Sequence, residues 1–273
     1  MTHWRRGLVI GKFRPPHKGH GLLIETALAR VDRLTVVVCA DASDSIPADL
    51  RAAWLRELYP TADVRVVDTT GRDPDDSALW ARLTRGWLGA APDVVFTSEA
   101  YGPRYARHLG CAHVAVDPER ARVPVSGSRV LADPAAHLAA LEPPVRAYFV
   151  PRVVLVGAES TGKSTLARAL AAHYGTSWVP EYGRTFWDGL LTLPCIAPTT
   201  ADFLHIARTQ RRLEEQLARH ADRVLICDTD AFCTWLWHER YLGTDAPALR
   251  ALVATPRLAG ALHADGRRDP LGG

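Results

Sequence analysis

The stretch Gly157-Ala-Glu-Ser-Thr-Gly-Lys-Ser-Thr165 organises the second half of this 273-residue chain. It matches the pattern G-x-x-x-x-G-K-[ST] at every fixed position, and this pattern is typical of a phosphate-binding loop. Residues 152–156 before it predict a buried strand, and the apolar spacing of residues 166–174 predicts a helix. The glycines let successive N–H groups face one anion at the positive end of that helix. A glycine-rich turn that binds nothing is the alternative, which the flanking strand and helix disfavour.

We expect this loop to bind ATP together with Mg²⁺. The ammonium group of Lys163 would add a mobile positive charge at the β- and γ-phosphates, and the hydroxyl of Ser164 would bind Mg²⁺. The expected nucleotide-binding residues are Gly157, Glu159, Ser160, Thr161, Gly162, Lys163, Ser164 and Thr165.

Acidic side chains follow two further predicted strands of this half. Residues 223–230, Arg-Val-Leu-Ile-Cys-Asp-Thr-Asp, predict an apolar strand that ends in two aspartates, one of which would bind Mg²⁺. We expect Asp228 to be this ligand and Asp230 to be the second candidate, with helix capping as the alternative for Asp230. Glu181 would lie at the carboxyl end of a short strand, near the γ-phosphate. The best helical pattern of the chain covers residues 202–219.

A second anion-binding pattern lies in the N-terminal half, at Gly11-Lys-Phe-Arg-Pro-Pro-His-Lys-Gly-His20. A predicted strand at residues 7–10 precedes it and a helical stretch follows, so it is again an anion site at a helix start. His17 and His20 are three residues apart and lie on one side of that helix. Both can donate hydrogen bonds to phosphate oxygens, and Lys12 can add a full charge. The pair alone is a weak signal, because neighbouring histidines are more often ordinary surface or core residues.

The whole ten-residue stretch resembles the G-x-F-x-P-x-H-x-G-H signature of the nucleotidyltransferase superfamily. The resemblance implies that this segment binds the triphosphate of ATP, and that Lys12, His17 and His20 stabilise charge during transfer of a nucleotidyl group. The fixed positions of the signature are Gly11, Phe13, Pro15, His17, Gly19 and His20.

Residues 125–131, Val-Ser-Gly-Ser-Arg-Val-Leu, resemble the second signature of the same superfamily, which grips the ATP phosphates. Ser126, Ser128 and Arg129 are then the expected phosphate-binding residues. The chain departs from the family here, because the arginine position of the signature falls on Leu131. Arg129 would point roughly the opposite way on a helix and would compensate only if the helix starts differently, so we expect slow adenylyl transfer.

Predicted strands and helices alternate between the two signatures. We expect strands at residues 34–40, 64–67, 93–97 and 113–116, and helices at 48–58 and 77–88. Strands with continuous apolar character are covered on both faces, as in a parallel sheet. The segment Ser98-Glu-Ala-Tyr-Gly102 at a strand end resembles the corresponding segment of the adenylyltransferase subgroup that acts on nicotinamide mononucleotide (NMN).

The predicted fold class is α/β with two doubly wound domains, a Rossmann-like nucleotidyltransferase domain and a P-loop kinase domain.

The proline-rich residues 141–151 are expected to break both helix and sheet and to mark the domain boundary. We assign residues 1–142 to the first domain and residues 152–273 to the second. Together the motifs resemble the bifunctional nicotinamide-nucleotide adenylyltransferase/ribosylnicotinamide kinase family of bacteria, over about residues 6–245. Residues 246–273 lack the strand and charged lid of that family, so we expect a mobile tail and slow kinase turnover.

The resemblance implies a transferase of NAD biosynthesis and salvage. In the C-terminal half, ATP would phosphorylate nicotinamide riboside to NMN, and Glu181 would accept the hydroxyl proton or position the hydroxyl. In the N-terminal half, ATP would transfer its adenylyl group to NMN, giving NAD and pyrophosphate. Three alternatives stay open: a kinase with an impaired adenylyltransferase half, a different nucleoside kinase, and a non-catalytic nucleotide sensor or regulator.

Composition limits the classes of partner. The formal net charge of +3, from 33 basic and 30 acidic residues, is too even to indicate a nucleic-acid partner. About six residues precede the first predicted strand, which leaves no room for a helix-turn-helix DNA-binding domain or a signal peptide. Five cysteines without a C-x-x-C pair favour a cytoplasmic protein, and no apolar run is long enough for a membrane span. A homo-oligomer is left open.

Overall fold

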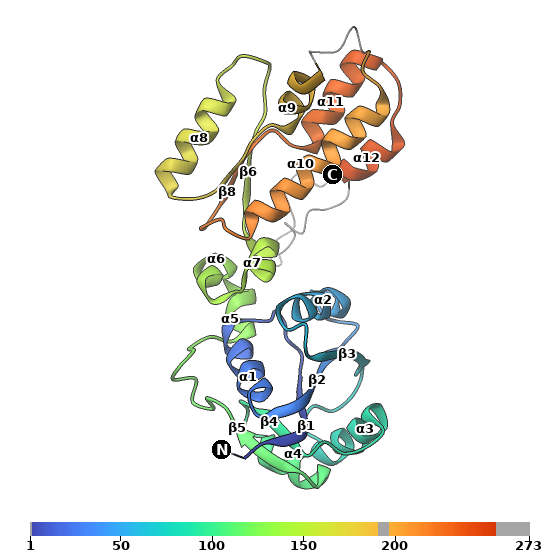
Figure 1. Ribbon diagram of the computed structural model, residues 1–273, viewed down its shortest axis with the longest axis vertical. Coiled ribbons are helices and arrows are strands. Elements are labelled where there is room, and N and C mark those ends of the chain that lie inside the picture. The colour runs from blue at the N-terminus through green and yellow to red at the C-terminus, as the bar shows by residue number, and fades with distance from the viewer. Residues whose placement is uncertain (1, 191–196, 255–273) are drawn as a thin grey trace. The chain divides into compact units, whose positions relative to one another are not determined.

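The computed structural model describes residues 2–190 and 197–254 of the chain. The chain divides into two compact units, Met1–Glu142 and Pro143–Gly273. Each unit has its own parallel sheet flanked by helices, which confirms the predicted α/β class (Figure 1). None of the described helices is long and apolar enough to cross a membrane.

The first unit is built on a five-stranded parallel sheet in the order β3-β2-β1-β4-β5. Its strands are β1 (Trp4–Gly11), β2 (Val31–Ala40), β3 (Asp63–Asp68), β4 (Val94–Thr97) and β5 (Ala112–Ala115). The chain runs outward from β1 to β2 and β3, then returns to β4 on the other side of β1. In sheets of this kind, ligands bind at the carboxyl ends of the strands where the order reverses, here β1 and β4.

Helices cover both faces of this sheet (Figure 1). On one face lie α1 (Lys18–Leu28) and α2 (Ala48–Leu58), and on the other lie α3 (Ser77–Leu88) and α4 (Gly102–Leu109). Val9 packs with Ile24 and Leu55 in the first core, whereas its neighbour Leu8 packs with Leu109 in the second. Because successive side chains of a strand point to opposite faces, the part of β1 that is covered on both sides, residues 7–10, lacks polar side chains.

The proline-rich residues 141–151 include α7 (Pro143–Phe149), which begins the second unit. The expectation that its prolines break helical structure is therefore wrong for these residues. Pro143 and Pro144 occupy the first turn, where a backbone N–H has no partner within the helix, and Pro151 falls after the helix ends. Three short helical segments precede α7 in the first unit: α5 (Gly127–Ala132), α6 (Pro134–His137) and the 3₁₀ turn Leu138–Ala140.

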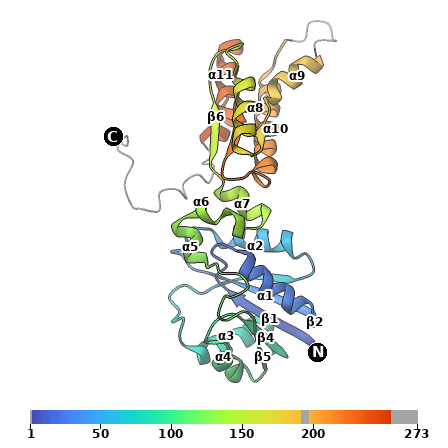
Figure 2. The same cartoon turned by 90° about the vertical axis from the view of Figure 1, so that its left-hand side faces the viewer.

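The second unit has a three-stranded parallel sheet in the order β6-β8-β7, formed by β6 (Arg152–Leu155), β8 (Leu225–Asp228) and β7 (Trp178–Val179). On one side, α8 (Lys163–Tyr174) packs Ala167 and Ala171 against Ile226 of β8. On the other side lie α10 (Thr200–Ala218), α11 (Ala231–Leu242) and α12 (Pro247–Ala254) (Figures 1 and 2). The helix α9 (Tyr182–Leu190) follows β7 and packs on α10.

The first part of the expected tail is a packed helix. Leu249 of α12 is fully buried together with Ala246, in the cluster that α10 and α11 also form. The guanidinium of Arg211 in α10 donates to the carbonyl of Leu252 at 2.6 Å. The expectation of a mobile tail is wrong for residues 246–254, because small and branched apolar side chains fill the space between the helices. Residues 255–273 lie outside the described part of the chain.

Candidate active sites

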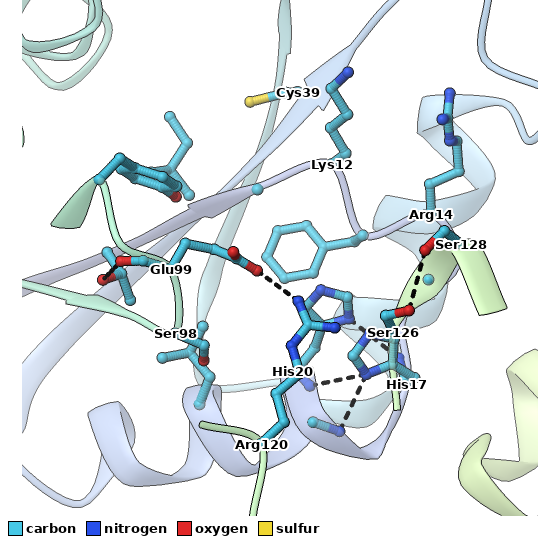
Figure 3. Close-up of a pocket in the computed structure, with 18 of the residues that line it drawn as sticks. Lys12, Arg14, His17, His20, Cys39, Ser98, Glu99, Arg120, Ser126 and Ser128 are labelled. Carbon is cyan, nitrogen blue, oxygen red and sulfur yellow. Dashed lines mark hydrogen bonds and ion pairs between the residues drawn. The ribbon is translucent and has the colours of Figure 1, made fainter. Parts of the chain in front are cut away.

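A cavity of about 410 Å³ opens at the carboxyl ends of β1 and β4 (Figure 3). The register that pairs Val9 with Phe96 brings the loops after these two strands to the same edge of the sheet. The loop after β1 carries the first signature, and the start of α5 carries the second. The predicted residues that line this cavity are Gly11, Lys12, Phe13, His17, Gly19, His20, Ser126 and Ser128.

The two imidazoles at the start of α1 have fixed orientations. The Nδ1 atom of His17 accepts hydrogen bonds from the backbone N–H groups of Gly19 (3.1 Å) and His20 (3.4 Å). The Nδ1 atom of His20 accepts from the backbone N–H of His17 (3.3 Å), so the two residues form a capping box. Their rings stack with centroids 3.8 Å apart. Because each Nδ1 accepts, each neutral ring carries its proton on Nε2, which can donate to a phosphate oxygen.

Both imidazoles are neutral near pH 7. Burial, with a smaller contribution from the charge of Arg120, lowers the pKa of His17 to about 4. Burial, followed by the charges of His17 and Arg120, holds the pKa of His20 well below its ordinary value. The pair therefore offers two neutral donors, and positive charge in the cavity must come from lysine and arginine side chains.

A buried ion pair positions the loop after β1. Arg51 of α2 is fully buried and donates to the carboxylate of Asp44 at 2.6 Å and to the carbonyls of Lys12 and Cys39. Arg14 donates to the other oxygen of Asp44 at 2.6 Å. A charge buried in this way must be paired, so Arg51 and Asp44 hold the backbone at Lys12 in place. Sequence reasoning missed both residues because neither belongs to a motif.

The structure shows where α5 places Arg129 and Leu131, the two residues in doubt at the arginine position of the second signature. Ser126 caps α5 by accepting the backbone N–H of Arg129 at 3.3 Å. The helix buries Val130 and turns the side chain of Arg129 to solvent, while Leu131 is half-buried. Neither Arg129 nor Leu131 is among the described residues that line the cavity. The predicted phosphate contact of Arg129 therefore lacks support from the geometry.

Arg120 is the cation of this cavity that sequence reasoning missed. Its loop runs between β5 and α5 and is held by the carboxylate of Asp117, which accepts backbone N–H bonds from Arg122 at 3.1 Å. The guanidinium of Arg120 donates to a carboxylate oxygen of Glu99 at 2.8 Å (Figure 3). In the sequence, this part of the cavity was indicated only by the family resemblance of the Ser98–Gly102 segment. Arg120 itself lies in an irregular loop without a periodic pattern.

The phosphate loop, residues 157–165, connects β6 to α8. Its backbone enters the left-handed region at Gly162 (φ 86°) and at Ser160 (φ 58°), which is uncommon for a residue other than glycine. Lys163 begins α8, and its ammonium donates to the carbonyl of Ala158 at 2.6 Å. The other predicted residues of the loop and of the first turn of α8 are Gly157, Glu159, Thr161, Ser164 and Thr165.

The carboxylate of Asp228 lies beside this loop. The register pairs Asp228 with Leu155, the last residue of β6, just before the loop begins. Asp228 is 1% exposed, and its Oδ1 has no hydrogen-bond partner among the described residues. A buried carboxylate oxygen without a donor is costly unless a cation binds it. The residues present therefore fit Mg²⁺, with the hydroxyl of Ser164 as a further oxygen ligand.

Asp230, the second predicted metal ligand, acts as the N-cap of α11. Its carboxylate accepts the backbone N–H of Cys233 at 3.1 Å, which is the capping alternative that the sequence left open. Within residues 2–190 and 197–254, no group of three or more His, Cys, Asp or Glu side chains is arranged to hold a metal ion. A cation here would need phosphate oxygens to complete its coordination, as Mg²⁺ commonly does.

A second cavity, of about 500 Å³, adjoins the phosphate loop at Glu159 and Ser160. Its aromatic lining residues are Trp187, Phe203, Trp237 and Tyr241. Glu181 follows β7, lines the cavity and pairs with Arg184 at 3.3 Å. Flat apolar walls with carboxylates at the phosphate-loop end suit a ring-bearing molecule that also carries hydroxyl groups.

Comparison with known families divides the chain in the same way as its motifs. Residues 8–131 match the cytidylyltransferase-like family, and residues 152–269 match an AAA domain. The chain therefore joins a cytidylyltransferase-like domain to a P-loop domain of the AAA class. The second match extends past residue 245, where the resemblance based on motifs was expected to end.

The chain is similar to the NadR proteins, in agreement with the family resemblance predicted from its motifs. It is 30% identical over 270 residues to the trifunctional NAD biosynthesis/regulator protein NadR of Escherichia coli. It is 29% identical over 268 residues to the protein of the same name from Salmonella typhimurium. In both cases the match covers 90% of this chain, which spans 65% of the length of the relative.

Two solved NadR structures share the fold. One, in complex with NR, gives a TM-score of 0.73 at 21% identity, covering 98% of this chain and 78% of the other. The second, in complex with NAD and AMP-PNP, gives a TM-score of 0.70 at 21% identity, covering 98% of this chain and 80% of the other. At this level of identity the likeness shows the fold.

Proposed function

We propose that this chain is a transferase of NAD biosynthesis that phosphorylates nicotinamide riboside and adenylylates the resulting NMN, using ATP in both reactions. The observation that carries the proposal is that each unit has its own phosphate site. One site presents the oriented imidazoles of His17 and His20, and the other presents the phosphate loop beside the buried carboxylate of Asp228. Similarity to NadR proteins supports the choice of substrates.

In the first site, a phosphate oxygen of NMN would attack the α-phosphorus of ATP. The new P–O bond forms as the bond to the bridging oxygen of pyrophosphate breaks, without a covalent enzyme intermediate. The Nε2–H groups of His17 and His20 would donate to phosphate oxygens, and Lys12 would offset their charge. Because the capping box fixes both rings in advance, little reorganisation accompanies the transfer.

In the second site, the 5′-hydroxyl of nicotinamide riboside would attack the γ-phosphorus of ATP, with ADP as the leaving group. The N–H groups of residues 157–165 would cradle the phosphates, and Lys163 would exchange its bond to the Ala158 carbonyl for phosphate oxygens. Ser164 and Asp228 would hold Mg²⁺, which would supply charge neutralisation for the phosphates. Glu181 would accept the hydroxyl proton or position the hydroxyl.

The second candidate function is a kinase whose adenylyltransferase half is impaired. It is favoured by Leu131 at the arginine position and by the exposure of Arg129 outside the cavity.

The described cysteines are free thiols, which suits the cytoplasmic location that we propose.

The two sites should be separable by mutation. Lys163→Ala is expected to abolish phosphorylation of nicotinamide riboside and to spare NAD formation from NMN and ATP. His20→Gln should do the reverse, because glutamine at this helix position preserves the capping box but lacks the imidazole donor. Each activity is measured separately by coupled assays, with circular dichroism as the control for folding. Loss of both activities in either folded variant contradicts the two-site proposal.

A further inference from the structure

We propose that Arg120 supplies the guanidinium that grips the triphosphate in the N-terminal cavity, in place of the arginine that the superfamily pattern puts at position 131. The identity of the ligand as ATP rests on the proposed function. The binding of a polyphosphate by Arg120 does not depend on that identity.

A triphosphate in this cavity needs a positive charge that the imidazoles do not supply. The imidazoles of His17 and His20 are neutral, so they donate hydrogen bonds but do not offset the charge of a triphosphate. Figure 3 shows Lys12 directed away from the two imidazoles, towards Cys39. Arg14 also lines the cavity, but its guanidinium is bound to the buried carboxylate of Asp44 at 2.6 Å. Arg120 is then the lining cation best placed to act with the imidazoles.

Arg120 lies close to both signatures. Arg120 lines the same cavity as His17 and His20, and its charge acts on both imidazoles. Its guanidinium donates to the carbonyl of Val125, the residue before the Ser126 cap of α5. The side chain is thus tied to the backbone of the second signature, where the family pattern places its arginine. The same guanidinium has further N–H donors in a planar fork that fits two phosphate oxygens.

The carboxylate partner of Arg120 can be displaced. The ion pair with Glu99 is exposed, with side-chain exposed fractions of 41% for Arg120 and 54% for Glu99. Exposed pairs contribute little free energy, so a polyphosphate can replace the carboxylate. The pair between Asp44 and Arg51 is buried and cannot be exchanged in this way. Glu99 therefore orients the side chain of Arg120 in the cavity, and it does not prevent a more highly charged anion from binding there.

The binding test uses the full chain and inorganic tripolyphosphate as the probe. The imidazole Cε1–H NMR signals of His17 and His20, assigned with His17→Asn and His20→Gln, report on anions at this site alone. We expect Arg120→Ala to raise the Kd for tripolyphosphate by about tenfold or more, and Arg120→Lys to restore part of the affinity. The matched control is Arg122→Ala, an exposed arginine of the same loop that does not line the cavity, which should stay within about twofold of wild type. Thermal unfolding should be unchanged in all three arginine variants, since the pair is exposed.

The activity test measures NAD formation from NMN and ATP. Arg120→Ala should lower kcat/KM by about 10²-fold, whereas Leu131→Arg should gain less than about threefold because the guanidinium is already supplied. A wild-type chain that forms no NAD would contradict the proposed function, while the tripolyphosphate titration would still decide the role of Arg120. The inference is overturned if Arg120→Ala binds tripolyphosphate as wild type does, if Arg129→Ala causes the large loss instead, or if the two imidazoles do not respond to the anion.

Discussion

A Cβ atom on Gly127 would stand 2.4 Å from the carbonyl oxygen of Arg14, far inside van der Waals contact. Gly127 belongs to the second signature, at the start of α5, and Arg14 belongs to the first, in the loop after β1. The two anion-binding segments therefore meet backbone to backbone, and this contact brings the start of α5 to the cavity that the imidazoles line. Only glycine permits so close an approach.

Gly127→Ala should separate the two segments. We expect a loss of about 1–3 kcal/mol in the free energy of unfolding, because the clash is with backbone and cannot be relieved by a side-chain rotation. NAD formation should fall at least about tenfold, and riboside phosphorylation should be unchanged. Gly86→Ala is the matched control: it lies inside α3 with open space around it, so alanine should be neutral or slightly stabilising. Full adenylyl transfer by Gly127→Ala would show that the contact does not position the site.

The buried pair of Asp44 and Arg51 should be important for stability. Their side chains are 3% and 0% exposed, so Asp44→Asn leaves a buried guanidinium without its counter-charge. We expect a loss of roughly 3–5 kcal/mol in the free energy of unfolding, measured by urea denaturation. Asp32→Asn removes a carboxylate from a pair with His3 that is more than half exposed, and it should change stability by less than about 0.5 kcal/mol. Equal effects of the two substitutions would refute this role of Asp44.

The stability of the protein should fall as pH drops below neutral. Burial first, and the charge of Arg120 second, lower the pKa of His17 from 6.5 in the unfolded chain to about 4 in the folded one. The unfolded chain therefore binds more protons between these two values, and folding loses roughly 2 kcal/mol from His17 between pH 7.5 and pH 5. His17→Asn keeps an N-cap and removes the titration, so its stability should depend less on pH. An unchanged pH profile in this variant would contradict the assignment.

The buried carboxylate of Asp228 should lower the folding stability of the protein while it provides a ligand for the metal. Its Oδ1 is buried without a hydrogen-bond partner among the described residues, so Asp228→Asn removes an uncompensated charge and should leave the protein at least as stable as wild type. Riboside phosphorylation should fall by about 10²-fold or more, and the thermal shift produced by Mg²⁺ with a non-hydrolysable ATP analogue should disappear. Asp230→Asn is the control, because asparagine is an equally good cap for α11. Loss of stability in Asp228→Asn with normal kinase activity would rule out a metal site here.

Much of the local structure could be predicted from spacing. The helices expected at residues 48–58 and 77–88 are confirmed at those bounds as α2 and α3. Strand ends were predicted less well: β1 begins at Trp4 rather than at residue 7, because Trp4 pairs with Val31 in a stretch that includes two arginines. Apolar periodicity does not report backbone pairing at a polar strand end.

The sequence by itself determined the two anion-binding segments, since a phosphate loop and a helix start are made from neighbouring residues whose glycines, caps and charges act over one turn. Tertiary structure alone decided which further groups complete the first cavity. Arg120 reaches it from an irregular loop, Arg51 of α2 pairs with Asp44 and binds the carbonyl of Lys12, and Gly127 admits the backbone of Arg14. These relationships depend on burial, charge pairing and contact distance between segments far apart in the chain, and no local pattern encodes them.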